Sequence, residues 1–300
     1  MLTLDRPEGP SPADAALTRR GVFGAASFAG YAAFALSAQA QPIHTPSEGL
    51  ETGDVVIPTQ DGSIPGYLAR PAGRGRRPCV LLVSEVFGLH EYIRDTARRL
   101  ARAGYVTIAP DFFARAGNPA PLTDFAAIQR IVATATNEQV MGDIAATLAW
   151  LRRQPFANAR RLGITGFCWG GAVVWMACSR FEDFDAGVAW YGRLTPPAAS
   201  EFLGAEQRPW PVQTAYALHA PVLGLYAGHD RGITAASIEE MRAQLAEHRK
   251  RDSAIVVYPD ASHGFHADYR DSYNRADAED GSRRLLAHFD RYVMPHGLFG

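Results

Sequence analysis

The residue whose type and context best suit catalysis is Cys168, which stands in the segment Gly-Phe-Cys-Trp-Gly-Gly at positions 166–171. Apolar stretches flank this segment on both sides, which predicts a strand, a tight turn and a helix. Hydrolases use such a turn, G-x-S-x-G, to hold a nucleophile in a strained backbone, and the glycines avoid steric clashes around it. Cysteine stands here where serine is usual. The turn places its sulfur at a helix N-terminus, where partial positive charge favours a thiolate.

Partners for the thiol lie farther along the chain, each at the end of a predicted strand. Asp230 follows the apolar segment 221–228, and His263 follows the segment 253–259. In hydrolases with this turn, the acid and the base follow the nucleophile in that order, on loops at the carboxyl edge of the sheet. We therefore predict a catalytic triad of Cys168, Asp230 and His263. The alternative is a structural strand-to-helix turn that holds a buried cysteine.

Competing polar residues lie next to this predicted triad. His229 adjoins the acid, Asp260 precedes the base, and His266 follows it by three positions. The spacing of His263 and His266 suits a pair of metal ligands, but no second motif supplies the remaining ligands. We expect no metal and no cofactor.

Strand and helix patterns alternate from residue 54 onward, which predicts a mostly parallel central sheet with helices on both faces. A hairpin around Asp61-Gly62 opens the pattern. The irregular segments 112–121 and 192–220 should rim the carboxyl edge, where ligands bind in open α/β folds. The expected strands span 79–85, 105–110, 161–167, 186–191, 221–228 and 253–259, and the expected helices 91–104, 138–153, 172–179, 235–249 and 280–293.

Residues 1–40 are predicted to be a twin-arginine export signal, and residues 41–300 a single domain delivered to the periplasm. Paired arginines at 19–20 precede a weakly apolar run at 21–37, and Ala38-Gln39-Ala40 fits the small-x-small pattern of a cleavage site. The alternative is a retained membrane anchor, but a run so rich in alanine, glycine and serine is poorly suited to span a bilayer.

The composition argues against nucleic acid as a binding partner. The formal net charge of −1 gives no electrostatic basis for binding nucleic acid. We expect a small-molecule substrate, and the sequence makes no prediction of oligomeric state. The chain has three cysteines, an odd number, and we expect Cys79, Cys168 and Cys178 to be free thiols.

From about residue 54 to residue 294 the chain resembles the dienelactone hydrolase family of the α/β-hydrolase fold. Four stretches carry the resemblance: SEVFGLHEYIRDTARRLARAGYVTIAPDFF, GITGFCWGG, VLGLYAGHDRGI and VVYPDASHGF. Members of this family have a cysteine nucleophile, so the resemblance implies that Cys168 is a native nucleophile. It also implies a hydrolase that opens lactones or cleaves small carboxylic esters through a thioester intermediate.

Further site residues follow from the resemblance and from the fold. The family carries a glutamate after the third strand, here Glu85, which contacts the resting thiol and shifts when substrate binds, helping the thiol to ionise. The alternative for Glu85 is a solvated loop carboxylate. An oxyanion hole requires one backbone N–H after the nucleophile and one after the third strand, which places it at Trp169 and Val86.

One position departs from the family pattern and leaves the substrate open. Members that open dienelactone bind its carboxylate with arginines, one of them four residues after the histidine, where this chain has Ala267. Tyr191, Arg193 and Arg270 are candidate substrate contacts in segments expected at the rim. Two alternative functions remain: a non-catalytic binding protein that keeps the fold, and a thioesterase or peptidase that uses the same triad.

Overall fold

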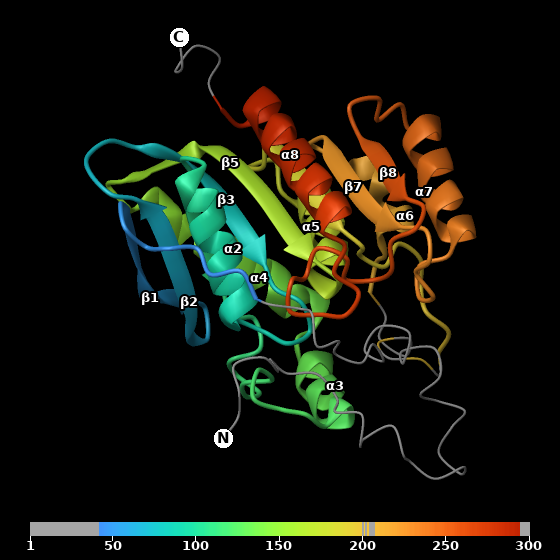
Figure 1. Ribbon diagram of the computed structural model, residues 1–300, viewed down its shortest axis with the longest axis horizontal. Coiled ribbons are helices and arrows are strands. Elements are labelled where there is room, and N and C mark those ends of the chain that lie inside the picture. The colour runs from blue at the N-terminus through green and yellow to red at the C-terminus, as the bar shows by residue number, and fades with distance from the viewer. Residues whose placement is uncertain (1–41, 200, 202, 204–207, 295–300) are drawn as a thin grey trace.

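The computed structural model describes residues 42–199, 201, 203 and 208–294, and these residues contain one eight-stranded sheet (Figure 1). The strand order is β1-β2-β4-β3-β5-β6-β7-β8. β2 pairs antiparallel with both β1 and β4, and every other neighbouring pair is parallel. The strands are β1 (Leu50–Thr59), β2 (Gly62–Pro71), β3 (Arg77–Val83), β4 (Val106–Pro110), β5 (Ala157–Phe167), β6 (Ala186–Trp190), β7 (Val222–Ala227) and β8 (Ala254–Tyr258).

Helices cover both faces of this sheet, as the alternating pattern predicts. α2 and α8 lie on the near face in Figure 1, and α4 and α5 lie behind the strands. This arrangement is the predicted α/β-hydrolase fold. The helices are α2 (Glu91–Arg102), α3 (Phe125–Thr134), α4 (Asn137–Arg152), α5 (Trp169–Arg180), α6 (Pro211–Thr214), α7 (Ala235–Glu247) and α8 (Arg275–Tyr292), with a 3₁₀ turn η1 (Ala215–Ala217).

Three helical segments differ from the sequence prediction. α3 was not expected, and α6 with η1 interrupts the predicted irregular segment 192–220. α8 begins at Arg275, five positions before the predicted start, because the Asn274 side chain caps it by accepting from the N–H of Asp277 at 3.3 Å.

The interior of the described domain is apolar, and its three cysteines are buried free thiols, as predicted. Burial raises the pKa of Cys79 to about 12 and also raises that of Cys178, so both stay protonated. No helix in the described ranges combines the length and the apolar character needed to cross a membrane. The predicted export signal at 1–40 lies outside the described residues.

The topology brings the polar side chains that could act in catalysis to one edge of the sheet. β3, β5, β6, β7 and β8 run parallel, so their carboxyl ends meet there. The loops that follow these five strands carry, in that order, Glu85, Cys168, Tyr191, Asp230 and His263.

Candidate active site

Cys168 occupies a strained turn between β5 and α5. Its backbone has φ 55° and ψ −115°, a conformation that residues with a side chain rarely adopt. A Cβ added at Gly166 would lie 2.5 Å from the carbonyl oxygen of Gly170, and one at Gly171 would lie 2.4 Å from that of Trp190. Glycine is therefore required at both positions, and the turn presents Cys168 at the N-terminus of α5.

The acid and base of the predicted triad lie in hydrogen-bonding contact. His263 Nδ1 is 2.6 Å from Asp230 Oδ2, and both side chains are buried. The other carboxylate oxygen, Oδ1, accepts from the N–H groups of Gly232 and Ile233 at 2.8 and 3.1 Å, which fixes its orientation. Asp230 thereby holds the imidazole with Nε2 as the nitrogen left to face Cys168.

The charge state of His263 follows from this environment. Burial lowers the pKa of His263, but the Asp230 carboxylate and, next, the Cys168 side chain outweigh it and raise the pKa to about 10. The imidazole is thus positively charged at neutral pH.

Glu85 is fully buried in the loop after β3, which excludes the solvated-carboxylate alternative. Its Oε2 accepts a 2.5 Å hydrogen bond from the Tyr269 hydroxyl and lies 3.5 Å from His90 Nε2, and its Oε1 accepts from Arg270 Nη2 at 3.2 Å. Burial raises the pKa of Glu85, but Arg270, His90 and Tyr269 together lower it to about 2. Glu85 is therefore an ion-paired carboxylate, and its expected contact with the Cys168 thiol stays a prediction.

Arg270 lies inside the protein, although the sequence suggested a rim position. Its side chain is 8% exposed, and the guanidinium covers the rings of Phe87 and Tyr269 at 4.8 and 5.3 Å. Burial lowers the pKa of Arg270, but the charges of Glu85, Tyr269 and Cys168 outweigh burial and raise it. The guanidinium therefore interacts electrostatically with the Cys168 side chain. Arg270 brings positive charge to the site, while the family's arginine position holds the buried Ala267.

Two other candidate substrate contacts are engaged with the protein itself. Tyr191 is fully buried at φ 36°, and its ring meets that of His263 edge-on at 5.0 Å. Arg193 Nη2 lies 3.1 Å from Glu201 Oε2. Contacts of these two residues with substrate stay predictions.

The predicted oxyanion hole lies where the loop after β3 meets the start of α5. Trp169 is the first residue of α5, so its backbone N–H has no acceptor within the helix. Val86 directly follows Glu85 and is 4% exposed. A Cβ added at Gly170 would lie 2.5 Å from the carbonyl oxygen of Ser84, which shows how closely these two segments approach.

Sequence reasoning missed the role of His266. Its Nδ1 lies 2.6 Å from the Tyr92 hydroxyl and its Nε2 lies 3.1 Å from Ser282 Oγ. Ser282 donates its own proton to the carbonyl of Ala278, so His266 Nε2 donates to Ser282 and Nδ1 accepts from Tyr92. Burial and the nearby Arg99 hold the pKa of His266 at about 3, so the ring is neutral. Both ring nitrogens of His266 therefore have hydrogen-bond partners within the protein, Tyr92 on α2 and Ser282 on α8.

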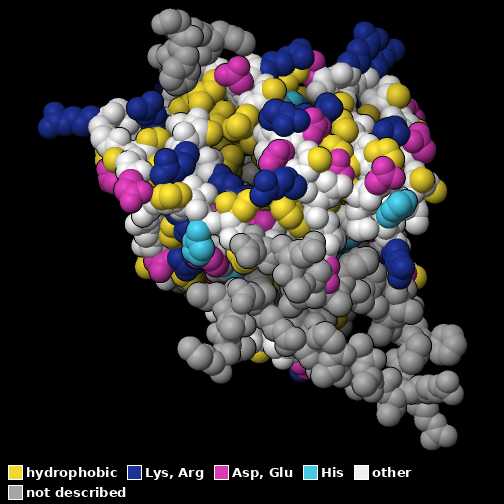
Figure 2. Space-filling model, viewed as in Figure 1, with side chains coloured by type: hydrophobic (Ala, Val, Ile, Leu, Met, Phe, Trp, Pro, Cys, Tyr) yellow, Lys and Arg dark blue, Asp and Glu magenta, His cyan; other side chains and the backbone are white. Residues whose placement is uncertain are grey.

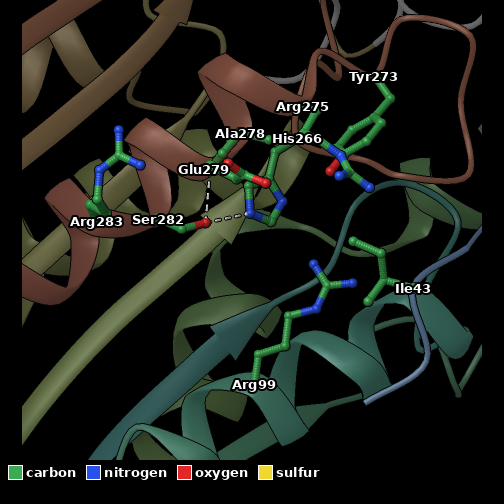
Figure 3. Close-up of a pocket in the computed structure, with 9 residues that line it drawn as sticks. All are labelled: Ile43, Arg99, His266, Tyr273, Arg275, Ala278, Glu279, Ser282 and Arg283. Atoms are coloured by element: carbon green, nitrogen blue, oxygen red, sulfur yellow. Dashed lines mark hydrogen bonds between the residues drawn. The ribbon is translucent and has the colours of Figure 1, made fainter.

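His266 also lines a groove of about 450 Å³ between α2 and α8 (Figure 3). Apolar, basic and acidic side chains are mixed over this face of the molecule, as Figure 2 shows. The His266 imidazole stacks on the ring of Phe167 at a centroid distance of 5.0 Å, and Phe167 directly precedes Cys168. The residues around the groove are Ile43, Arg99, His266, Tyr273, Arg275, Ala278, Glu279, Ser282 and Arg283.

Comparison with known proteins identifies the family of this chain. The model of the dienelactone hydrolase family matches residues 64–293. A protein of Methylorubrum extorquens with the provisional name carboxymethylenebutenolidase is 43% identical over 282 residues, which cover 93% of this chain and 95% of that protein. A Bradyrhizobium protein, provisionally named 2-oxo-3-(5-oxofuran-2-ylidene)propanoate lactonase, is 30% identical over 77% of this chain and 91% of its own length.

A solved structure from Klebsiella pneumoniae, provisionally named a dienelactone hydrolase, superposes with a TM-score of 0.74 at 40% identity. The match covers 81% of this chain and 99% of that one. The fold and the family predicted from the sequence are both confirmed. The chain belongs to the dienelactone hydrolase family and is a hydrolase of the carboxylic ester class.

Proposed function

We propose that the protein opens lactones or cleaves small carboxylic esters through a Cys168–Asp230–His263 triad and a thioester intermediate. The observation that carries this proposal is the buried 2.6 Å contact between His263 Nδ1 and Asp230 Oδ2, beside a cysteine in a strained turn. Such a contact fixes the imidazole in the orientation that proton transfer at Nε2 requires.

In the acylation step, the Cys168 thiolate attacks the carbonyl carbon while His263 carries a proton. The carbonyl oxygen becomes an oxyanion, which accepts hydrogen bonds from the backbone N–H groups of Val86 and Trp169. When the tetrahedral intermediate collapses, the C–O bond of the ester breaks and His263 gives its proton to the departing alkoxide. In a lactone this alkoxide stays attached, so the ring opens to a hydroxyacyl thioester.

In the deacylation step, the now neutral His263 takes a proton from water. The resulting hydroxide attacks the thioester carbon, the C–S bond breaks, and the product leaves as a carboxylic acid. The sulfur departs as a thiolate beside a protonated imidazole, which restores the starting state. Asp230 stays ionised throughout and stabilises the imidazolium.

We also propose that Arg270 positions Glu85 and balances its charge, in addition to any contact with substrate. The Glu85–Arg270 pair brings one negative and one positive charge to the vicinity of the sulfur. Displacement of the carboxylate by an entering substrate would leave the cation to stabilise the thiolate. A nearby positive charge favours the charged form of an acidic group such as a thiol.

Lactones are the first substrates to test, because the relatives include one named as a lactonase. The proposed experiment is a panel of lactones and activated esters, assayed with the wild-type domain and with Cys168→Ala. We expect turnover of at least one substrate class, reduced to the residual activity of the oxyanion hole in the variant. Full turnover by a folded Cys168→Ala protein would contradict the thiol mechanism. Titration of one fast-reacting thiol distinguishes an enzyme from a non-catalytic binding protein.

Export to the periplasm is the second part of the proposal. It rests on the paired arginines at 19–20 and the small-x-small segment at 38–40. An exported thiol enzyme is exposed to oxidants, and a nucleophile that is 2% exposed is partly protected from them.

A further inference from the structure

A buried hydrogen-bond donor beside the nucleophile has no partner within the described part of the protein. The indole of Trp169 is 6% exposed, and its Nε1–H donates to no acceptor there. Two other buried tryptophans have protein acceptors for their indole N–H groups. Trp175 Nε1 donates to the Tyr226 hydroxyl at 3.0 Å, and Trp190 Nε1 donates to Thr165 Oγ1 at 3.1 Å. A buried donor without an acceptor is unfavourable, so its retention calls for an explanation.

The indole lies at the edge of the sheet where the reaction is proposed to occur. Trp169 directly follows Cys168, and its ring packs against Phe112 and Phe113, from the loop after β4, at centroid distances of 6.0 and 4.9 Å. A second buried polar atom without a partner in the described ranges, Ser84 Oγ, lies at the end of β3. The backbones of the two segments approach closely, since a Cβ added at Gly170 would lie 2.5 Å from the carbonyl oxygen of Ser84. Ser84 and Trp169 therefore belong to the two segments that flank the proposed oxyanion hole.

We infer that the Trp169 indole N–H binds an acceptor oxygen of the substrate, other than the oxygen of the scissile carbonyl. This inference rests on the proposed function and narrows its substrate class. An indole nitrogen donates and cannot accept, so it selects a carbonyl or ether oxygen over a donor group. The neighbouring aromatic rings favour an uncharged, flat or short group at this place. The preferred substrates are therefore esters or lactones whose acyl part carries a second oxygen.

The test compares two p-nitrophenyl esters of nearly equal size, the methoxyacetate and the butanoate, in which an ether oxygen replaces one methylene. A 3-oxobutanoate ester places the second oxygen elsewhere in the acyl chain. Trp169→Phe keeps an aromatic ring and the backbone N–H but removes the indole donor. The ratio of kcat/KM for each oxygen-bearing ester to kcat/KM for butanoate cancels effects of the variant that are common to all substrates.

We expect this ratio to fall roughly five- to tenfold in Trp169→Phe for at least one oxygen-bearing ester, the loss of one neutral hydrogen bond. Trp175→Phe is the matched control, because it removes an indole N–H from the same helix that already has a protein acceptor. That control should leave the ratio unchanged, although it lowers stability by leaving the Tyr226 hydroxyl without its partner. An unchanged ratio in Trp169→Phe for every ester would overturn the inference.

Binding measurements separate this inference from the proposed function. Calorimetry on Cys168→Ala protein compares the affinities of methoxyacetic, 3-oxobutanoic and butanoic acids, with and without Trp169→Phe. A selective loss of affinity for an oxygen-bearing acid supports the indole contact whether or not the thiol mechanism holds. An equal loss for all three acids, or no loss, contradicts it. Failure of the proposed function shows separately, as ester turnover that persists in Cys168→Ala.

Discussion

Replacing Glu85 with glutamine removes one buried negative charge and nearly preserves the shape of the side chain. The carboxylate is fully buried, and its pKa is about 2 instead of the ordinary 4.5. Burial alone would raise that pKa, so the contacts with Arg270, His90 and Tyr269 outweigh the burial cost. At about 1.4 kcal/mol per pKa unit, the lowering corresponds to about 3 kcal/mol of folding stability at neutral pH.

The pH dependence of this contribution has a definite sign. The pKa of Glu85 is lower in the folded state than in the unfolded state, so its stabilisation is present above about pH 4.5 and is lost as the pH falls toward 2. Glu85→Gln should therefore be about 3 kcal/mol less stable than the wild type at pH 7. The difference should shrink to less than half by pH 3.

Urea unfolding followed by circular dichroism at pH 7, 5, 4 and 3 measures this difference. Glu51→Gln is the matched control, because Glu51 pairs with Arg70 while its side chain is 51% exposed. An exposed pair of this kind contributes less than about 1 kcal/mol. Equal stability of Glu85→Gln and the wild type at pH 7, with parallel pH curves, would refute the assignment of Glu85 as a charged, ion-paired group.

Three further predictions concern the thiol and the N-terminus. Cys168→Ser should lose at least ~100-fold in kcat/KM, about 2.7 kcal/mol of transition-state stabilisation, because a hydroxyl ionises far less readily than a thiol; full activity of this variant would show that the site is not specific for sulfur. The rate of alkylation of Cys168 at a fixed pH should shift upward in Glu85→Gln and downward in Arg270→Gln, since the first variant removes a negative charge and the second a positive one; shifts in the same direction would disprove the charge-balancing role of the pair. N-terminal sequencing of exported protein should begin at or near Gln41, and recovery of only full-length chain from cells with a working twin-arginine pathway would contradict cleavage.

The strands and the residues that directly follow them were predictable from sequence because both depend on patterns within a few neighbouring residues. Apolar runs bounded by turn residues located β3, β5, β7 and β8 within a few positions. In a parallel sheet the carboxyl ends of such strands meet at one edge, so the sequence predicts that Cys168, Asp230 and His263 lie together. The start of α8 was missed because one capping side chain, Asn274, decides it.

The partners of Glu85 could not be predicted in the same way. Arg270 is 185 positions from Glu85 in sequence, and the contact exists only because the fold brings the loop before α8 against the loop after β3. An arginine in a loop carries no sequence signal that separates a rim position from a buried ion pair. The Tyr92–His266 contact joins residues 174 positions apart, and local sequence patterns could not predict it either.

Two ion pairs near Cys168 make its electrostatics different from those of an isolated triad. In the first pair, Asp230 holds the His263 imidazole, while the Glu85–Arg270 pair lies on the loops after β3 and before α8. Each pair is close to neutral as a whole, so a thiolate is the one uncompensated charge that forms when Cys168 ionises. Movement of Glu85 away from Arg270 would release a cation toward that thiolate, whereas its return would oppose the charge. A serine hydroxyl, which passes its proton on only during attack, would gain little from such a device. The second pair therefore gives a physical reason for cysteine at this turn, and the opposite alkylation shifts expected for Glu85→Gln and Arg270→Gln test that reason directly.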